Sequence, residues 1–396
     1  MILYSSMKSA HKAYLIIPKL IEQPTWGGNY ILSLKKLLSI NNLRNKKIGQ
    51  SYELFGQSKL HLTLHDSTNT SFLPEFGFAD KPDISAESKQ YKEGVDSITL
   101  ENLVKENPSA VLGKDVLEKF GKMPLLIKIN QAFGNSFQLH IKPGVSHPHW
   151  KSKPESWYYL EDGLITFGIK KNCNLEAYKK ACFAIDDYMK YLSNKVMNKS
   201  LALEDAKKEA KKYIENSNPW QFINVHEVKK FDLIDLSIGG LHHSWEENKQ
   251  KFPQGNVVYE VQQDVMDPVS TIRSFDQGKI KDDGSIRKIA IEDYFKLLDT
   301  DPTHNNLDNM RQSRKGTRLL TTDYYCLDIL EVQDVMTYQT ENSFNHLFVR
   351  EGCVEIKTEE NTLKLSSGHS CFLPQQVGSY IIKAVTPSIV LKTFIE

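Results

Sequence analysis

Short apolar runs separated by turn residues are the feature that most constrains the fold of this chain. Such runs fill Pro124–Gly144, continue from Trp157 to Lys170, and return from Thr321 to Glu396. Several short strands with turns between them are typical of a β-sandwich or barrel. The pattern therefore predicts a mainly β protein in which two β-rich regions are separated along the chain.

The middle of the chain breaks this pattern. Between Asn174 and Ile214, apolar residues such as Tyr178, Cys182 and Ile185 recur at helical spacing. A second amphipathic helix is expected over Leu201–Ile214. We interpret this segment as a helical insertion whose apolar stripe packs into a core.

Four shorter segments complete the expected elements. Leu60–Leu64 alternates like a half-buried strand, and Ala79–Gly94 is polar enough for a surface loop. Ser97–Gly113 is predicted to form a short capped helix, and Ile291–Leu298 a packing helix.

Composition excludes several classes of protein. The chain has 396 residues, 40% hydrophobic residues and a net charge of +1, which argues against a general nucleic-acid binder. No run approaches the ~20 apolar residues that cross a membrane. The apolar patch Tyr14–Ile17 is too short for a signal sequence. Five cysteines without a C-x-x-C pair argue against a disulfide framework and favour reduced thiols and a cytoplasmic location.

Two polar patterns in the first β-rich region indicate a metal site. Ser136, Gln138 and His140 alternate along one expected strand, so they share a face that could form a pocket wall. His140, with Gln138, could then bind a metal. Lys153 and Glu155 share one face of an extended segment, where a carboxylate can complete a zinc site and a lysine can hold an anion.

A glycine-rich turn brings two histidines toward the same region. The cupin pattern has a histidine three residues after a glycine, and both Gly239 with His242 and Gly240 with His243 fit that spacing. Glu260 lies in an apolar strand, where a charge is costly unless it is paired or functional. Arg273 and Lys279 follow, and they supply cations suited to a phosphate and a developing oxyanion.

In their order along the chain, these motifs resemble the type I phosphomannose isomerase family. Lys19-Leu20 with Trp26-Gly27-Gly28 is similar to the family's opening K-L…W-G-G, and Ile48–Glu53 to I-G-E-S-W-E, with Gln50 departing from the usual Glu. Gln138 and His140 match Q-x-H, and Lys153–Tyr158 matches K-P-E-x-W-Y.

The resemblance implies a double cupin: two β-sandwich or jelly-roll barrels with an inserted helical subdomain. It implies a catalytic cupin domain over residues 1–159 and 217–290, with a helical stretch near 97–121. The helical insertion would cover 160–216, a linker and packing helix 291–320, and a C-terminal cupin-like β domain 321–396. His346 and His369 in that last domain are expected to be structural.

The resemblance also implies an activity, the interconversion of mannose 6-phosphate and fructose 6-phosphate through a cis-enediol, which serves GDP-mannose biosynthesis. One Zn²⁺ per chain would be bound by Gln138, His140, Glu155 and either His242 or His243. Counting from Asp232 without gaps favours His242, whereas the small residue after the family's ligand favours His243.

The remaining site residues follow from the same resemblance. Ser136, Lys153 and Lys279 would bind the substrate phosphate, and Arg273, Glu260 and Lys128 would be catalytic. The general base stays open between Glu260, Lys128 and the non-ligand histidine.

Three departures from the family pattern bear on the substrate. The interval between Glu260 and Arg273 is longer, by the segment Asp264–Pro268; Ser152 replaces a histidine of some members; and no proline precedes Gly239. A non-catalytic sugar-phosphate-binding or regulatory cupin, or an isomerase of another phosphorylated sugar, are the alternatives. The expected partner is a small sugar phosphate, with no nucleic acid or membrane, and the protein would be a monomer or homodimer.

Overall fold

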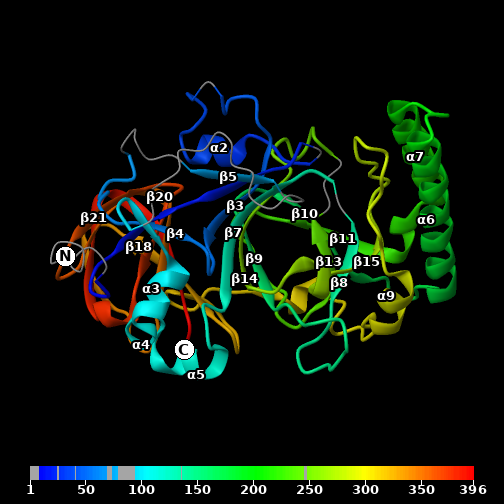
Figure 1. The fold of residues 1–396 in the computed structure, drawn as a ribbon. Helices are drawn as coiled ribbons and strands as arrows, with labels where there is room; N and C mark the ends of the chain where they lie inside the picture. Colours follow the sequence, from blue (N-terminus) through cyan, green and yellow to red (C-terminus); the bar gives the residue numbers. More distant parts are fainter. Residues whose placement is uncertain are drawn as a thin grey trace. The chain divides into compact units, whose positions relative to one another are not determined.

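The computed structural model describes residues 9–24, 26–40, 42–68, 74–78, 94–134, 136–244 and 248–396. These residues form two compact units (Figure 1). Unit 1 comprises residues 1–131, 259–264 and 312–396, and unit 2 comprises 132–258 and 265–311. The predicted catalytic domain includes parts of both units, and its boundaries stay a prediction. Most of the predicted surface loop, 79–93, lies outside the described residues.

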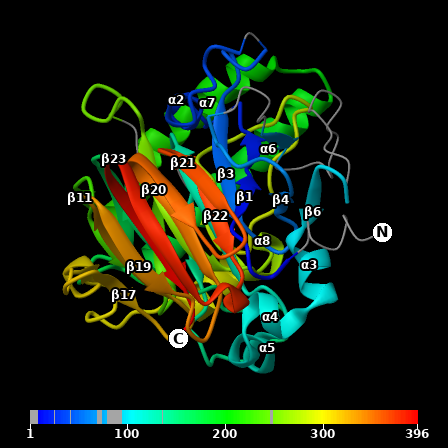
Figure 2. The same ribbon diagram turned by 90° about the vertical axis from the view of Figure 1, so that its left-hand side faces the viewer.

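Unit 1 is built on a large, mainly antiparallel sheet (Figure 2). Its strand order is β17-β18-β23-β20-β22-β1-β4-β6, with β19 on β23 and β21 on β20. Their bounds are β1 Tyr14–Ile17, β4 Lys59–His61, β6 Ser97–Thr99, β17 Arg318–Thr321, β18 Cys326–Val332, β19 Val335–Gln339, β20 Asn345–Lys357, β21 Thr362–Ser366, β22 Ser370–Leu373 and β23 Ser379–Phe394. Alternate residues of these strands, including Leu347, Val349 and Ile382, are fully buried in one core.

A second set of strands in unit 1 positions two of the predicted site residues. Antiparallel β2 and β3 pair with each other, β5 joins β2 in parallel, and β7 joins β3. Their bounds are β2 Lys19–Glu22, β3 Ile48–Leu54, β5 Glu75–Phe78 and β7 Leu125–Ala132. Strand β14, Asn256–Gln263, begins in unit 2 and carries Glu260 in unit 1.

The helices of unit 1 are short: α2 Tyr30–Leu34, α3 Leu100–Glu106, α4 Pro108–Leu112 and α5 Lys114–Phe120. The helix expected over Ser97–Gly113 is therefore interrupted. The Thr99 hydroxyl caps α3 by accepting from the Asn102 amide at 3.3 Å, so the residues before it stay in strand β6. The strand expected over Leu60–Leu64 ends at His61. The ring nitrogen Nδ1 of His61 accepts hydrogen bonds from the backbone amides of Thr63 and Leu64, and these bonds turn the chain.

Unit 2 contains a five-stranded sheet of order β11-β10-β13-β8-β15, and its strands β9 and β12 are antiparallel neighbours in another sheet. The bounds are β8 Phe137–His140, β9 Glu155–Tyr159, β10 Gly163–Ile169, β11 Ile223–Val228, β12 Leu233–Asp235, β13 Gly240–Ser244 and β15 Ile272–Phe275. Short helices α8, Asp267–Ser270, and α9, Ile291–Leu297, flank β15 in the sequence.

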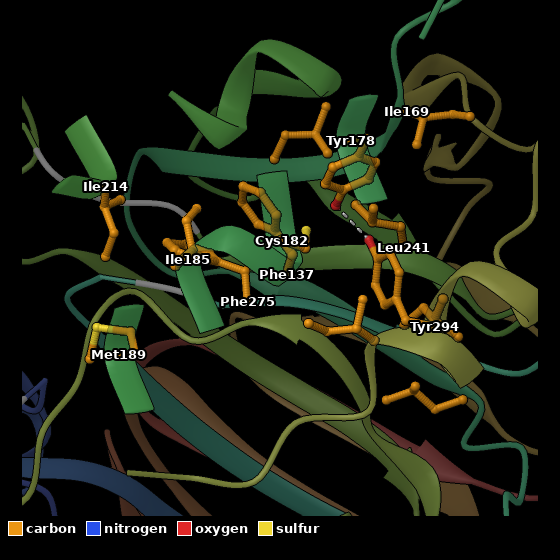
Figure 3. Close-up of a cluster of buried hydrophobic side chains, with 14 of the residues drawn as sticks. Phe137, Ile169, Tyr178, Cys182, Ile185, Met189, Ile214, Leu241, Phe275 and Tyr294 are labelled. Carbon is orange, nitrogen blue, oxygen red and sulfur yellow. Dashed lines mark hydrogen bonds between the residues drawn. The ribbon is translucent and has the colours of Figure 1, made fainter. Parts of the chain in front are cut away.

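The predicted inserted helices are present in unit 2, although the range predicted for them, 160–216, also contains strand β10 and the first helix begins only at Leu175. Helix α6 spans Leu175–Met197 and α7 spans Leu203–Ser217, and the two pack side by side (Figure 1). The apolar stripe of α6 meets residues of β8 and β15, where the Tyr178 and Tyr294 hydroxyls hydrogen-bond at 2.9 Å (Figure 3). In the described residues, no helix is long and apolar enough to cross a membrane.

The mainly β fold is confirmed, with one correction to its shape. Each sheet of the described residues has two end strands, such as β6 and β17 of the large sheet, so none closes into a barrel. The predicted jelly-roll barrels are open sheets.

Candidate metal centre

Strand β8 and the residue before it present a row of polar side chains to the interior of unit 2. Ser136, Gln138 and His140 are 3%, 8% and 1% exposed, and the Ser136 hydroxyl donates to Gln138 Oε1 at 3.3 Å. Strand β8 is held between β13 and β15, where His140 pairs with Gly240 and Gln138 with Arg273. The alternation expected from the sequence is therefore observed, but as a buried face.

Three potential ligands from three strands meet beside this row. His140 Nε2 lies 3.5 Å from Glu155 Oε2, and His242 Nε2 lies 2.8 Å from Glu155 Oε1. One nitrogen or oxygen from each of these residues lies within 4.8 Å of the others, and all three side chains are buried. Two imidazoles and a carboxylate at this separation are a donor set that suits zinc.

The surroundings of His140 prepare it to bind a metal. Its Nδ1 lies 2.6 Å from the carbonyl oxygen of Ser270, so Nδ1 carries the proton and the lone pair of Nε2 faces Glu155. Nε2 has no hydrogen-bond partner in the described part of the chain. Burial lowers the pKa of His140 to about 3, which keeps the ring neutral. The residues present thus fit a bound cation.

Glu155 carries the negative charge of the cluster. Its burial disfavours ionisation, but Lys153, whose Nζ lies 2.8 Å from Oε2, and then the two histidines hold the pKa of Glu155 well below its usual range. Lys153 is itself 6% exposed. The predicted phosphate-binding lysine therefore also neutralises the predicted carboxylate ligand.

The two candidate histidines of β13 follow a glycine turn and face opposite sides of the strand. Gly239 has φ of +78°, and a Cβ there would lie 2.8 Å from the carbonyl oxygen of His140, so only glycine fits. Because neighbours on a strand face opposite sides, His242 turns toward Glu155, whereas His243 faces away from the cluster. Burial, and then Lys279 and Arg273, lower the pKa of His243. The geometry favours His242 over His243 as the ligand.

The two cations that follow are paired with carboxylates. Arg273 Nη2 lies 2.8 Å from Asp267 Oδ2, and Lys279 Nζ lies 3.9 Å from Asp276 Oδ1. Asp267 comes from the segment Asp264–Pro268, which lengthens this interval relative to the family pattern. The contacts of Asp267 and of the Ser270 carbonyl could not be predicted from sequence spacing, because they depend on how helix α8 turns the chain.

Glu260 and Lys128 are brought together in unit 1. Glu260 is 3% exposed, and its Oε1 lies 3.2 Å from Lys128 Nζ. Its Oε2 accepts a short hydrogen bond from Asn130 Nδ2. Asn130 is a further polar residue of this group, and strand alternation places it on the same face of β7 as Lys128.

Comparisons with known proteins agree with this architecture. Residues 315–392 match the family model "Mannose-6-phosphate isomerase, cupin domain". The mannose 6-phosphate isomerase of Bacillus subtilis superposes with a TM-score of 0.61 at 17% identity, covering 97% of this chain and 99% of the other. The Salmonella typhimurium mannose 6-phosphate isomerase bound to fructose 6-phosphate and zinc superposes with a TM-score of 0.61 at 13% identity, covering 96% and 99%.

The chain has the fold of the mannose-6-phosphate isomerases. The predicted cupin architecture is therefore confirmed, and the family match confirms the resemblance for the C-terminal β region. No curated protein sequence matches the chain. The mannose-6-phosphate isomerase fold thus persists here at a low level of sequence identity.

Proposed function

We propose that this protein is a metal-dependent aldose–ketose isomerase that interconverts mannose 6-phosphate and fructose 6-phosphate. The observation that carries the proposal is the buried cluster of His140, Glu155 and His242 on a mannose-6-phosphate isomerase fold. A neutral histidine with its lone pair directed at a carboxylate is arranged to bind a cation rather than to serve as core packing.

Zinc is the proposed cofactor, one ion per chain, with Gln138 as the fourth ligand beside the three clustered residues. When bound, the ion supplies a Lewis acid that polarises the sugar oxygens. His140 and His242 donate neutral nitrogens, and Glu155 donates a charge that partly balances the ion.

The other predicted residues have roles in holding and converting the sugar. Ser136, Lys153 and Lys279 hold the phosphate, which contributes binding energy remote from the reacting carbons. Arg273 stabilises the negative charge that develops on the enediolate oxygen. Glu260, Lys128 or His243 takes the proton from one of C1 and C2 and returns it to the other.

One comparison tests metal and activity together. Purified protein is assayed with mannose 6-phosphate before and after chelation and metal return, beside His140→Ala and the exposed-site control His149→Ala. Chelation and His140→Ala should each abolish both turnover and bound zinc in elemental analysis, and His149→Ala should change neither. Full metal occupancy in His140→Ala, or turnover that survives complete metal removal, would refute the proposal. A metal-loaded protein without turnover would identify a sugar-phosphate-binding cupin instead.

A further inference from the structure

A chain of hydrogen bonds in unit 1 ends on the carboxylate of Glu260. Gln50 Nε2 on β3 donates to Asn130 Oδ1 on β7 at 3.0 Å. Asn130 Nδ2 then donates to Glu260 Oε2, and Lys128 Nζ lies 3.2 Å from Glu260 Oε1. Gln50 and Asn130 are paired residues of adjacent strands, so the sheet itself sets their separation.

The negative charge of Glu260 determines which group donates and which accepts in each of these hydrogen bonds. A carboxylate only accepts hydrogen bonds, so Asn130 must turn its NH₂ group toward Glu260. Its carbonyl oxygen then faces Gln50, which must supply a donor. A glutamine side chain can do so and a glutamate cannot. The departure of Gln50 from the family's usual Glu thus matches the polarity that Asn130 and Glu260 require.

We infer that Gln50 and Asn130 are positioning residues, which fix the Glu260 carboxylate by a directional relay of side-chain amides. The relay orients one oxygen of Glu260 through N–H donors while Lys128 orients the other. Its consequence for catalysis rests on the proposed function, in which Glu260 is a catalytic residue, but the relay itself rests only on these contacts.

Two substitutions, Gln50→Glu and Glu260→Gln, change which groups can donate in this series of hydrogen bonds. In Gln50→Glu, Asn130 meets an acceptor on both sides, and whichever way its amide turns, one acceptor faces another. In Glu260→Gln, the amide at 260 can direct its carbonyl at Lys128 and its NH₂ at Asn130, which then turns its own NH₂ toward residue 50. That arrangement accepts either Gln or Glu at position 50.

The experiment is a thermal-unfolding cycle of wild type, Gln50→Glu, Glu260→Gln and the double variant, in which the two residue types are exchanged. Gln50→Glu should lower Tm by about 4 °C in the wild-type background, because a half-buried acceptor is left facing another acceptor. The same change should cost close to nothing in Glu260→Gln. Equal costs in both backgrounds would overturn the relay.

Two controls separate the relay from simple charge repulsion. Gln376→Glu, at an exposed site of unit 1, adds the same charge and should leave Tm unchanged in both backgrounds. Repulsion between two carboxylates is weakened at about 1 M salt, where the Debye length is roughly 3 Å, whereas an unsatisfied acceptor is not relieved. A cost of Gln50→Glu that disappears at high salt would also overturn the relay.

Kinetics then test the catalytic consequence. Gln50→Met, which is uncharged and cannot donate, should lower kcat about tenfold with little change in KM, as expected for a misdirected proton-transfer group. An unchanged kcat in this variant would contradict the positioning role. Full activity in Glu260→Gln would remove Glu260 from the proposed mechanism, while the unfolding cycle would still decide the relay.

Discussion

At the scale of single residues, two predicted phosphate ligands have different surroundings. Lys153 is buried against Glu155 at 2.8 Å, whereas Lys279 is 31% exposed in its side chain and 3.9 Å from Asp276. Burial, opposed by Asp276, lowers the pKa of Lys279. Lys153 therefore contributes to the charge balance of the metal cluster, and Lys279 is the freer of the two to meet a phosphate.

We predict that Lys279→Ala raises the KM for mannose 6-phosphate by about 10- to 100-fold, the loss expected for a charge-assisted hydrogen bond worth roughly 1.5–3 kcal/mol. Its Tm and zinc content should match the wild type. Lys153→Ala should raise KM and also lower Tm, because it leaves Glu155 without its cation. Steady-state kinetics with elemental analysis measure both variants. Wild-type KM in Lys279→Ala would exclude this lysine from phosphate binding.

Most of the candidate cluster could be predicted from the sequence, because strand alternation and a glycine turn are local properties. Alternation grouped Gln138 with His140, and the same rule could have grouped Asn130 with Lys128. The partners that come from a bend, Asp267 and the Ser270 carbonyl, could not be predicted, since sequence spacing does not determine where a short helix directs a side chain.

At the scale of elements, helix α6 depends on its buried stripe. Ile185 is 3% exposed within the core cluster shown in Figure 3, whereas Met197, at the end of the helix, is 52% exposed. The helix was predictable because five apolar residues that are buried in the structure repeat at helical spacing: Tyr178, Cys182, Ile185, Met189 and Leu192.

We predict that Ile185→Ala destabilises unit 2 by about 2–5 kcal/mol, the usual cost of removing buried methyl groups and leaving a cavity. Met197→Ala should cost no more than about 0.5 kcal/mol. Urea unfolding measures both. If Ile185→Ala lowers the free energy of unfolding by less than about 1 kcal/mol, the change is no larger than at an exposed site. That result would show that α6 is not packed as described.

Strand β15 and helix α8 together hold Arg273. The family resemblance implies a catalytic role for Arg273, and the structure pairs its guanidinium with Asp267. The longer interval thus supplies a carboxylate close to a residue with a proposed role in catalysis.

For Arg273→Lys we expect kcat to fall by about 10²–10³, the loss typical of one electrostatic group that acts in the transition state, with sugar-phosphate affinity largely kept. Asp267→Asn removes the ion pair but keeps the guanidinium, so its loss of kcat should be much smaller. Stopped assays with melting curves compare the two. If both variants lose Tm equally and keep kcat, Arg273 only anchors the loop.

At the scale of the whole molecule, unit 1 buries histidines that are remote in sequence from the predicted ligands. His346 is fully buried, with Nδ1 3.2 Å from the Tyr259 hydroxyl, and burial, aided by Lys35, lowers its pKa to about 3. Burial likewise lowers the pKa of His369 to about 3. Both were expected to be structural, and this arrangement gives them a measurable effect on stability.

Because the unfolded chain protonates these histidines near pH 6.5 and the folded chain only near pH 3, stability falls as pH drops from about 6.5. We predict that His346→Gln reduces this slope by up to about 1.4 kcal/mol per pH unit, while its amide can still bond to Tyr259. Urea unfolding between pH 5 and pH 7 measures the slope, with the exposed-site variant His149→Gln as control. An unchanged slope in His346→Gln would contradict the prediction.

The mainly β fold and the inserted helices could be predicted from the sequence, but the composition of the two units could not. Periodicity reports which face of a strand is buried, not which distant strand it will pair with. Leu15 on β1 pairs with Cys371 on β22, and no local pattern in either segment specifies that register.

That pairing imposes an order on the synthesis of the protein. Strand β23 lies inside the large sheet between β18 and β20, so a growing polypeptide cannot finish unit 1 until Ser379–Phe394 has been made. On one side β1 pairs with the nearby β4, whereas its partner on the other side, β22, is made more than 350 positions later. Contacts of such long sequence separation form slowly and leave strand edges open to aggregation. Shielding of β1 by a chaperone until β22 has been made would limit such aggregation.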